Sequence, residues 1–278
     1  MRPIVPLLAV ALLAALPVAA QDRNERNEGT RLLRYPDVSA SDIAFVYGGD
    51  LWRVPRTGGV AVRLTAHAGS ELYPKFSPDG RWIAFSAEYS GTRQVWVMPA
   101  AGGEPRQLTW YTDVGPLPVR GGTDYRVLDW TPDGRNVLVR MNRVPWDERG
   151  GRPYLVPVDG GMETALPVPE TGGGSLSPDG TKFAYTPIDA DWRGWKRYRG
   201  GRAPDVWVYD LARGRERQIT RGGSEVLSHG EAEFVAAEEM ARFTGWWWAP
   251  DGKSILFQET DAREVEVWQV ADPAYPEK

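Results

Sequence analysis

Residues 76–85 read FSPDGRWIAF, and this stretch decides the fold because it returns along the chain. Its proline presets the first turn position, its aspartate bonds back to the backbone, and its glycine accepts a positive φ angle. The apolar triplet Ile83-Ala84-Phe85 follows as a strand. Further copies occupy residues 130–139, 176–185 and 248–257, and a degenerate copy starts at Tyr35-Pro36-Asp37. The repeat predicts a series of β-hairpins.

Each hairpin is followed by a third apolar run and then by a glycine-containing turn. The third runs lie at residues 51–54, 95–98, 154–156, 206–209 and 265–270. In the first four units a fourth strand is predicted to end near Thr65, Thr109, Leu166 and Thr220. Four strands in a unit of roughly 40–50 residues are typical of a β-propeller blade. We therefore expect an all-β fold over residues 31–278, with about five four-stranded blades.

The fifth unit is incomplete, because no glycine turn and no fourth strand follow Val270. Residues near Thr30–Leu33 could supply the missing strand and close a five-bladed ring. The other interpretation, favoured by the proline-rich end, is that the chain is a piece of a longer propeller protein.

The composition excludes several kinds of site. The chain has 278 residues, no cysteine and only two histidines, His67 and His229. Disulfides, thiolate metal sites and cysteine nucleophiles are therefore excluded, and we expect no metal and no cofactor. The formal net charge of −4 disfavours nucleic acid as a partner.

Residues 1–20 have the pattern of a secretory signal peptide. Arg2 precedes an apolar run from Ile4 to Leu16, and small residues end at Ala20. We expect cleavage after Ala20, a polar and flexible stretch over residues 21–30, and a periplasmic or secreted protein. An uncleaved anchor is the alternative.

The repeats resemble known propellers. Residues 31–221 resemble the WD40-like repeats of TolB and of tricorn-type proteases, most closely in GDLWRVPRTGG (49–59) and LYPKFSPDGRWIAFSAEYSG (72–91). Residues 224–278 instead resemble the N-terminal propeller of the dipeptidyl peptidase IV family, through LSHGEAEFVAAEEMARFTGWWWAPDGKSILFQETD (227–261). The resemblance changes between Arg213 and Ser224.

One segment, near residues 229–242, has a helical period and carries the candidate site. Adjacent Glu238 and Glu239 point about 100° apart on a helix, so both can converge on one cation. The resemblance to dipeptidyl peptidase IV implies that this pair binds the free α-amino group of a peptide. The alternative is a solvated acidic helix face on which Arg242 pairs with Glu238. The repeated aspartates Asp79, Asp133, Asp179 and Asp251 are instead predicted to form turns.

The chain contains no Gly-x-Ser-x-Gly nucleophile elbow. Both resemblances imply that catalytic residues lie in a separate C-terminal hydrolase domain, so we expect no catalytic residue here. The leading interpretation is the non-catalytic propeller of a secreted serine peptidase that gates substrate and anchors a peptide with a free N-terminus. A homo-oligomer is compatible with this interpretation. A free-standing TolB-like protein-binding propeller is the second interpretation. A five-bladed glycosidase is the third, and it would need acids at inner positions that we predict to be mostly apolar.

Overall fold

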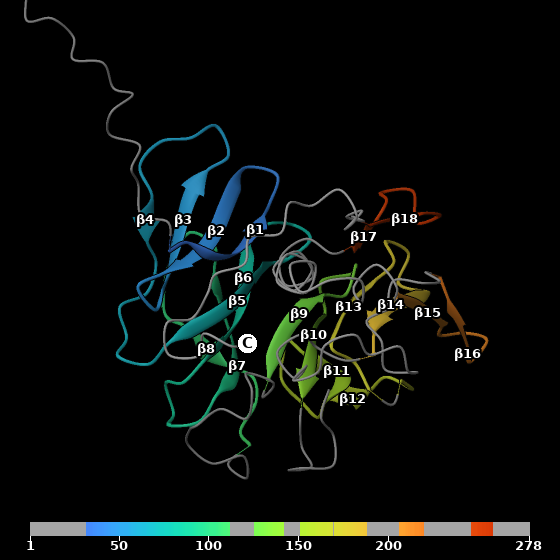
Figure 1. Cartoon of the computed structure of the whole chain (residues 1–278). Helices are drawn as coiled ribbons and strands as arrows, with labels where there is room; N and C mark the ends of the chain where they lie inside the picture. The colour runs from blue at the N-terminus through green and yellow to red at the C-terminus, as the bar shows by residue number, and fades with distance from the viewer. Residues whose placement is uncertain are drawn as a thin grey trace, which may run out of the picture. The chain divides into compact units, whose positions relative to one another are not determined.

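The computed structural model describes residues 32–111, 125–141, 151–168, 170–187, 206–219 and 246–257. Every regular element within these ranges is a β-strand (Figure 1). The described residues include no helix long and apolar enough to span a membrane.

The strands form five antiparallel sheets, which we call the first to fifth blades. The first blade contains β1 (Arg34–Val38), β2 (Asp42–Tyr47), β3 (Asp50–Pro55) and β4 (Val62–Arg63). The second contains β5 (Glu71–Phe76), β6 (Trp82–Ala87), β7 (Gln94–Pro99) and β8 (Arg106–Gln107). The third contains β9 (Arg126–Trp130), β10 (Asn136–Met141), β11 (Arg152–Pro157) and β12 (Thr164–Ala165). The fourth contains β13 (Gly173–Leu176), β14 (Lys182–Thr186), β15 (Trp207–Asp210) and β16 (Arg215–Gln218), and the fifth contains β17 (Trp246–Trp248) and β18 (Ile255–Phe257).

The blades follow one another as a β-propeller requires. Within each blade the strands pair in chain order. Between blades, β1 contacts β5, β5 contacts β9, and β9 contacts β13. The first strand of each blade is therefore the inner strand, and the predicted propeller of four-stranded blades is confirmed.

The hairpin turn between the first two strands is held by its own side chains. In the second blade the Asp79 carboxylate accepts hydrogen bonds from the Ser77 hydroxyl at 2.5 Å and from the Arg81 N–H at 3.1 Å. These bonds, that of Ser77 first, lower the pKa of Asp79 to about 2. Thr131 with Asp133 and Ser177 with Asp179 repeat the arrangement. The prediction that these aspartates form turns is confirmed.

Successive turns pack on one another. A methyl group added to Gly134 would lie 3.8 Å from Cδ of Pro78 in the preceding turn. The corresponding pairs are Gly80 with Ser39, Gly180 with Pro132, and Gly252 with Pro178. The turn motif thus joins neighbouring blades as well as neighbouring strands.

In the third and fifth blades the last residue of the inner strand is hydrogen-bonded to the blade before it. The Trp130 indole donates to the Lys75 carbonyl at 2.9 Å, and the Trp248 indole donates to the Ser175 carbonyl at 3.3 Å. Phe76, Trp130 and Leu176 are at most 8% exposed at this position, whereas Val38 of the first blade is 55% exposed. The described residues show no blade preceding the first.

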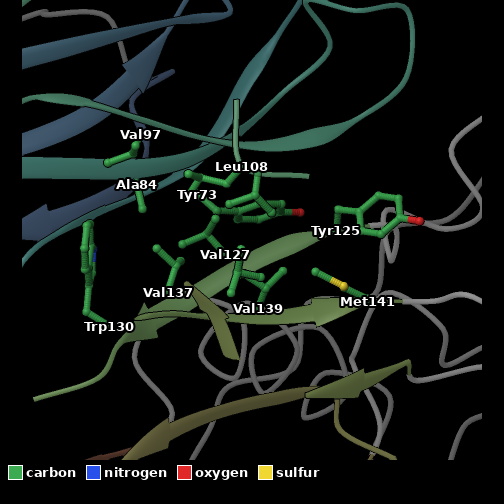
Figure 2. Close-up of a cluster of buried hydrophobic side chains, with 12 residues drawn as sticks. Tyr73, Ala84, Val97, Leu108, Tyr125, Val127, Trp130, Val137, Val139 and Met141 are labelled. Carbon is green, nitrogen blue, oxygen red and sulfur yellow. The ribbon is translucent and has the colours of Figure 1, made fainter. Parts of the chain in front are cut away.

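The hydrophobic core lies in the seams between blades, and each sheet contributes to both of its seams. On β10, Val137, Val139 and Met141 pack toward the second blade, whereas Leu138 packs toward the fourth. Figure 2 shows Val127, Val137 and Val139 between Trp130 and Tyr125 in the seam of the second and third blades. Because both faces of a sheet are covered, the second strands are uninterrupted apolar runs rather than alternating ones.

Several predictions made from the sequence lie outside the described residues. They are the leader over residues 1–20, the polar stretch 21–30, the helix near 229–242 and the third strand of the fifth unit at 265–270.

The close packing of Gly174 gives a test of the contacts within the fourth blade. A Cβ atom there would lie 2.2 Å from Cζ of the buried Phe183 and 3.0 Å from the Ala184 carbonyl oxygen. We expect Gly174→Ala to lower the free energy of unfolding by about 1–3 kcal/mol, as overpacking does. The control is Gly173→Ala, whose Cβ would meet only the Thr186 hydroxyl at 3.9 Å. Equal urea midpoints for the two variants would contradict this packing.

The hydrogen bond from the Trp130 indole to the Lys75 carbonyl, between the third and second blades, gives another test. Trp130→Phe removes the donor to the Lys75 carbonyl and should cost about 0.5–1.5 kcal/mol of stability, because a partly buried hydrogen bond is lost. Trp110 is 65% exposed, so Trp110→Phe should change stability by no more than about 0.5 kcal/mol. Thermal melting of both variants measures the difference. An unchanged melting temperature for Trp130→Phe would show that the bond does not contribute to stability.

Candidate functional site: charged side chains on the inner strands

Three tyrosines at or next to the inner strands adopt backbone conformations that are rare for bulky residues. The φ angles of Tyr35, Tyr73 and Tyr125 are 52°, 55° and 46°. In β1 and β5 the strand register shifts at the tyrosine, between Arg34 and Asp37 and between Leu72 and Lys75. Such conformations cost about 1–3 kcal/mol each and concentrate at functional positions. They direct us to the inner strands as the candidate site.

The shift in register is followed by charged side chains at matching positions. Asp37, Lys75 and Asp129 each come directly before the last residue of their inner strand. Their pairing partners are Ala44 on β2, Ala84 on β6 and Leu138 on β10, respectively. All three are half-buried. Three consecutive inner strands therefore present an acid, a base and an acid, which we call the inner charge row.

Asp37 connects the first two blades through both of its carboxylate oxygens. Oδ1 lies 2.9 Å from Nζ of Lys75, and Oδ2 accepts the Phe76 N–H at 2.8 Å. Charge-assisted hydrogen bonds of this kind are stronger than neutral ones. The Asp37 side chain thereby fixes both the side chain and the backbone of the next inner strand.

Burial and charge act in opposite directions on Lys75. Desolvation alone would lower the pKa of the Lys75 ammonium, but the carboxylates of Asp37 and Asp129 outweigh it and raise the pKa above its ordinary value. Lys75 therefore stays charged in the row.

Asp129 is the more weakly compensated acid. Burial raises the pKa of Asp129 to about 6, although Lys75 and the Trp130 N–H, which donates to Oδ1 at 2.8 Å, favour the charged form. Arg126 adds a second base, with Cζ 4.4 Å from the centroid of the Tyr73 ring. The row with Arg126 thus balances two acids with two bases.

This arrangement suits binding of charged groups better than acid–base catalysis. Lys75 interacts electrostatically with both acids of the row, so they do not act as an isolated carboxylate pair. No group of three or more His, Asp or Glu side chains within the described ranges is placed to hold a metal ion. The sequence-based expectation that inner positions are mostly apolar describes most residues of β5 and β9, but it did not include these charged positions. The repeat alignment, which places Lys75 and Asp129 just before Phe76 and Trp130, was the signal that could have located them.

The site residues predicted from the sequence, Glu238 and Glu239, lie outside the described residues, as does Arg242. His67 is described. Its Nδ1 accepts the Gly69 N–H at 2.9 Å, and its ring lies 4.4 Å from that of Tyr89.

Two families match different parts of the chain. Residues 30–230 match the tricorn protease N-terminal β-propeller domain, and residues 201–278 match the N-terminal region of dipeptidyl peptidase IV. The two matches overlap over residues 201–230, which contain the predicted change of resemblance between Arg213 and Ser224. The recognition made from the repeat phrases is confirmed.

Individual relatives agree with this division. Tricorn protease homolog 1 of Streptomyces coelicolor is 32% identical over 176 residues, which are 63% of this chain and 16% of the relative. An N-terminal subunit of a tricorn-like protease from Sulfurisphaera tokodaii is 25% identical over 170 residues, 60% of this chain and 80% of that protein. Mouse dipeptidyl peptidase 8 is 32% identical over 103 residues, 31% of this chain and 11% of the relative. The chain thus spans about a sixth or less of the length of the Streptomyces and mouse proteins.

Solved structures share the fold. The crystal structure of the tricorn protease superposes with a TM-score of 0.56 at 23% identity, over 71% of this chain and 19% of that one. TolB from Acinetobacter baumannii superposes with a TM-score of 0.52 at 20% identity, over 68% of this chain and 43% of that one. Because the first family match covers well over half of the 278 residues, the chain belongs to the family of tricorn protease N-terminal β-propeller domains.

Proposed function

We propose that this chain is the non-catalytic propeller portion of a secreted serine peptidase, where it gates substrate and holds the amino end of a peptide through Glu238 and Glu239. The observation that carries the proposal is the match of residues 201–278, which include both glutamates, to the N-terminal region of dipeptidyl peptidase IV. The tricorn match over residues 30–230 supports the peptidase context.

The amine-binding role follows from simple chemistry. Two carboxylates that converge on one ammonium group provide charge-assisted hydrogen bonds, each worth about 1.5–3 kcal/mol. An acetylated peptide end has no ammonium group and keeps a single neutral amide N–H donor, so it cannot make charge-assisted bonds to both carboxylates. The pair would therefore discriminate free from blocked N-termini.

The gating role draws on the inner charge row. Asp37, Lys75 and Asp129 are half-buried and held by partners from neighbouring blades. Fixed charges of both signs favour or reject charged groups that approach along the inner strands. Cleavage of the peptide bond would be carried out by a separate hydrolase domain. A homo-oligomer would be compatible with this arrangement.

Peptide binding tests the proposal directly. We expect the chain to bind a short peptide with a free N-terminus and to bind its N-acetylated form at least about 10-fold more weakly. Glu238→Gln and Glu239→Gln should each weaken binding of the free peptide by about 10-fold or more while leaving binding of the acetylated form unchanged. Isothermal titration at low salt gives the dissociation constants.

Glu231→Gln and Glu233→Gln are the matched controls, because they remove acids from the same predicted helix without touching the pair. They should bind like the parent chain. Equal affinity for free and acetylated peptides would overturn the amine site and favour a protein-binding propeller of the TolB kind. An equal loss in all four variants would indicate a general acidic surface.

A further inference from the structure

A buried acid outside the inner charge row lies between the first and second blades. Glu71 begins β5, and its backbone N–H donates to the Gly49 carbonyl, in the turn between β2 and β3, at 2.8 Å. Its side chain is 0% exposed. Its position at this seam makes Glu71 a link between the two blades.

The surroundings of the Glu71 carboxyl are polar but do not satisfy it. The hydroxyls of Tyr89 and Thr65 lie near enough to favour the charged form of Glu71, and the nearby Asp50 carboxylate disfavours it. Among the described residues, however, no hydrogen bond reaches either Glu71 oxygen, the Tyr89 hydroxyl or Oδ1 of Asp50. A charged carboxylate without partners is costly to bury, whereas a protonated carboxyl gains a donor and loses its charge.

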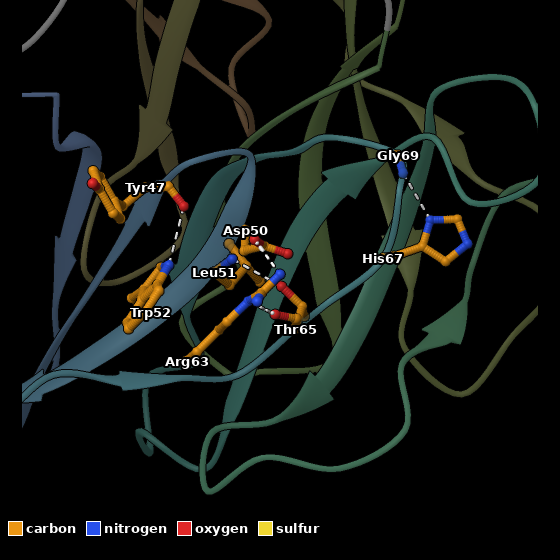
Figure 3. A network of polar contacts seen from close by, with 8 residues as sticks. All are labelled: Tyr47, Asp50, Leu51, Trp52, Arg63, Thr65, His67 and Gly69. Carbon is orange, nitrogen blue, oxygen red and sulfur yellow. Dashed lines mark hydrogen bonds and ion pairs between the residues drawn. The ribbon is translucent and has the colours of Figure 1, made fainter.

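The nearby charges cancel without Glu71. Asp50 Oδ2 pairs with Arg63 at 2.7 Å (Figure 3). On the connection between β6 and β7, Arg93 pairs with Glu88 at 2.7 Å. The titratable groups around Glu71 are completed by His67, on the connection from β4, and by Tyr89, whose pKa is raised by burial and by Glu71. One negative charge, that of Glu71, remains, and one proton removes it.

We propose that Glu71 is a proton-operated clasp between the first two blades, which holds them together when its carboxyl is neutral and loosens the seam when it ionises. A neutral Glu71 can donate to Thr65 or to Asp50 and accept from Tyr89 after small rotations. An ionised Glu71 would draw water into the seam beside the bond between its own N–H and the Gly49 carbonyl. The first blade would then open locally from the second, as weakly held elements of a fold do.

The titration range makes this clasp relevant near neutral pH. Burial raises the pKa of Glu71 from 4.5 to about 7. Between these two values the folded chain binds more protons than the unfolded chain, so stability falls as the pH rises and levels off above about pH 7. Asp129 also has a raised pKa, but it lies on another inner strand and is unchanged in a Glu71 variant.

The test compares the wild type with Glu71→Gln between pH 5 and pH 8. The amide is neutral at every pH, so the variant should gain stability relative to the wild type as the pH rises. The unfolding equilibrium constant of the wild type relative to the variant should increase roughly 50- to 100-fold over this range, as the pKa change from 4.5 to about 7 requires. Glu104→Gln, at an exposed acid in the turn between β7 and β8, is the control and should show no such trend.

Hydrogen exchange localises the effect, and added salts separate the proton from a metal ion. At pH 8, peptides covering residues 44–55 should exchange faster in the wild type than in Glu71→Gln, while those covering residues 207–218 should exchange equally. A difference in stability that does not vary with pH would overturn the proposal. Stabilisation of the wild type, but not of the variant, by sodium, potassium or calcium chloride at pH 8 would show that a metal cation rather than a proton neutralises Glu71. That result would also overturn the proposal.

Discussion

The contact on which the rest of this structure depends is the seam between consecutive blades. A four-stranded blade has two apolar faces and no other layer to cover them, so each blade is stable only between neighbours. The seam repeats the same elements: a turn glycine over the preceding turn, a large residue at the end of the inner strand, and apolar residues from the second strands. Val38, at the equivalent position of the first blade, is exposed, and the part of the chain that the structure describes places no blade before it.

The fold could be predicted because one short motif encodes both the hairpin and the seam. The Pro-Asp-Gly turn is a local signal, since proline, aspartate and glycine each favour it for a separate physical reason. The apolar triplet Ile83-Ala84-Phe85 also indicates that both faces of the second strand are buried. In the structure Ala84 packs into one seam and its two neighbours pack into the other. Four such units, each with a third strand in the predicted place, leave little choice of architecture.

The repeat alignment can place the residues of the inner charge row at matching positions, but their pairing could not be predicted, because it depends on contacts between blades. Asp37 and Lys75 are 38 residues apart in sequence, and their ion pair forms only when consecutive inner strands lie side by side. The rare backbone conformation of Tyr35 and Tyr73 is likewise a property of the assembled sheet, since nothing in a Tyr-Pro dipeptide demands a positive φ angle. A two-residue period makes Asp37 and Lys75 look like ordinary solvent-facing positions. Their partial burial comes from the neighbouring blades.

Burial raises the pKa of Asp129 and of Glu71 by similar amounts, although the charged groups beside the two acids differ. Asp129 has a nearby ammonium group and a backbone N–H donor, and burial still raises its pKa from 3.8 to about 6. Glu71 faces another acid, Asp50, whose base is already engaged, and burial raises its pKa to about 7. In each case the adjacent blade supplies the charged group beside the acid. In a fold whose stability is a sum of neighbour contacts, a change of charge at one seam acts on that seam first, so a buried acid there can adjust one blade without unfolding the others.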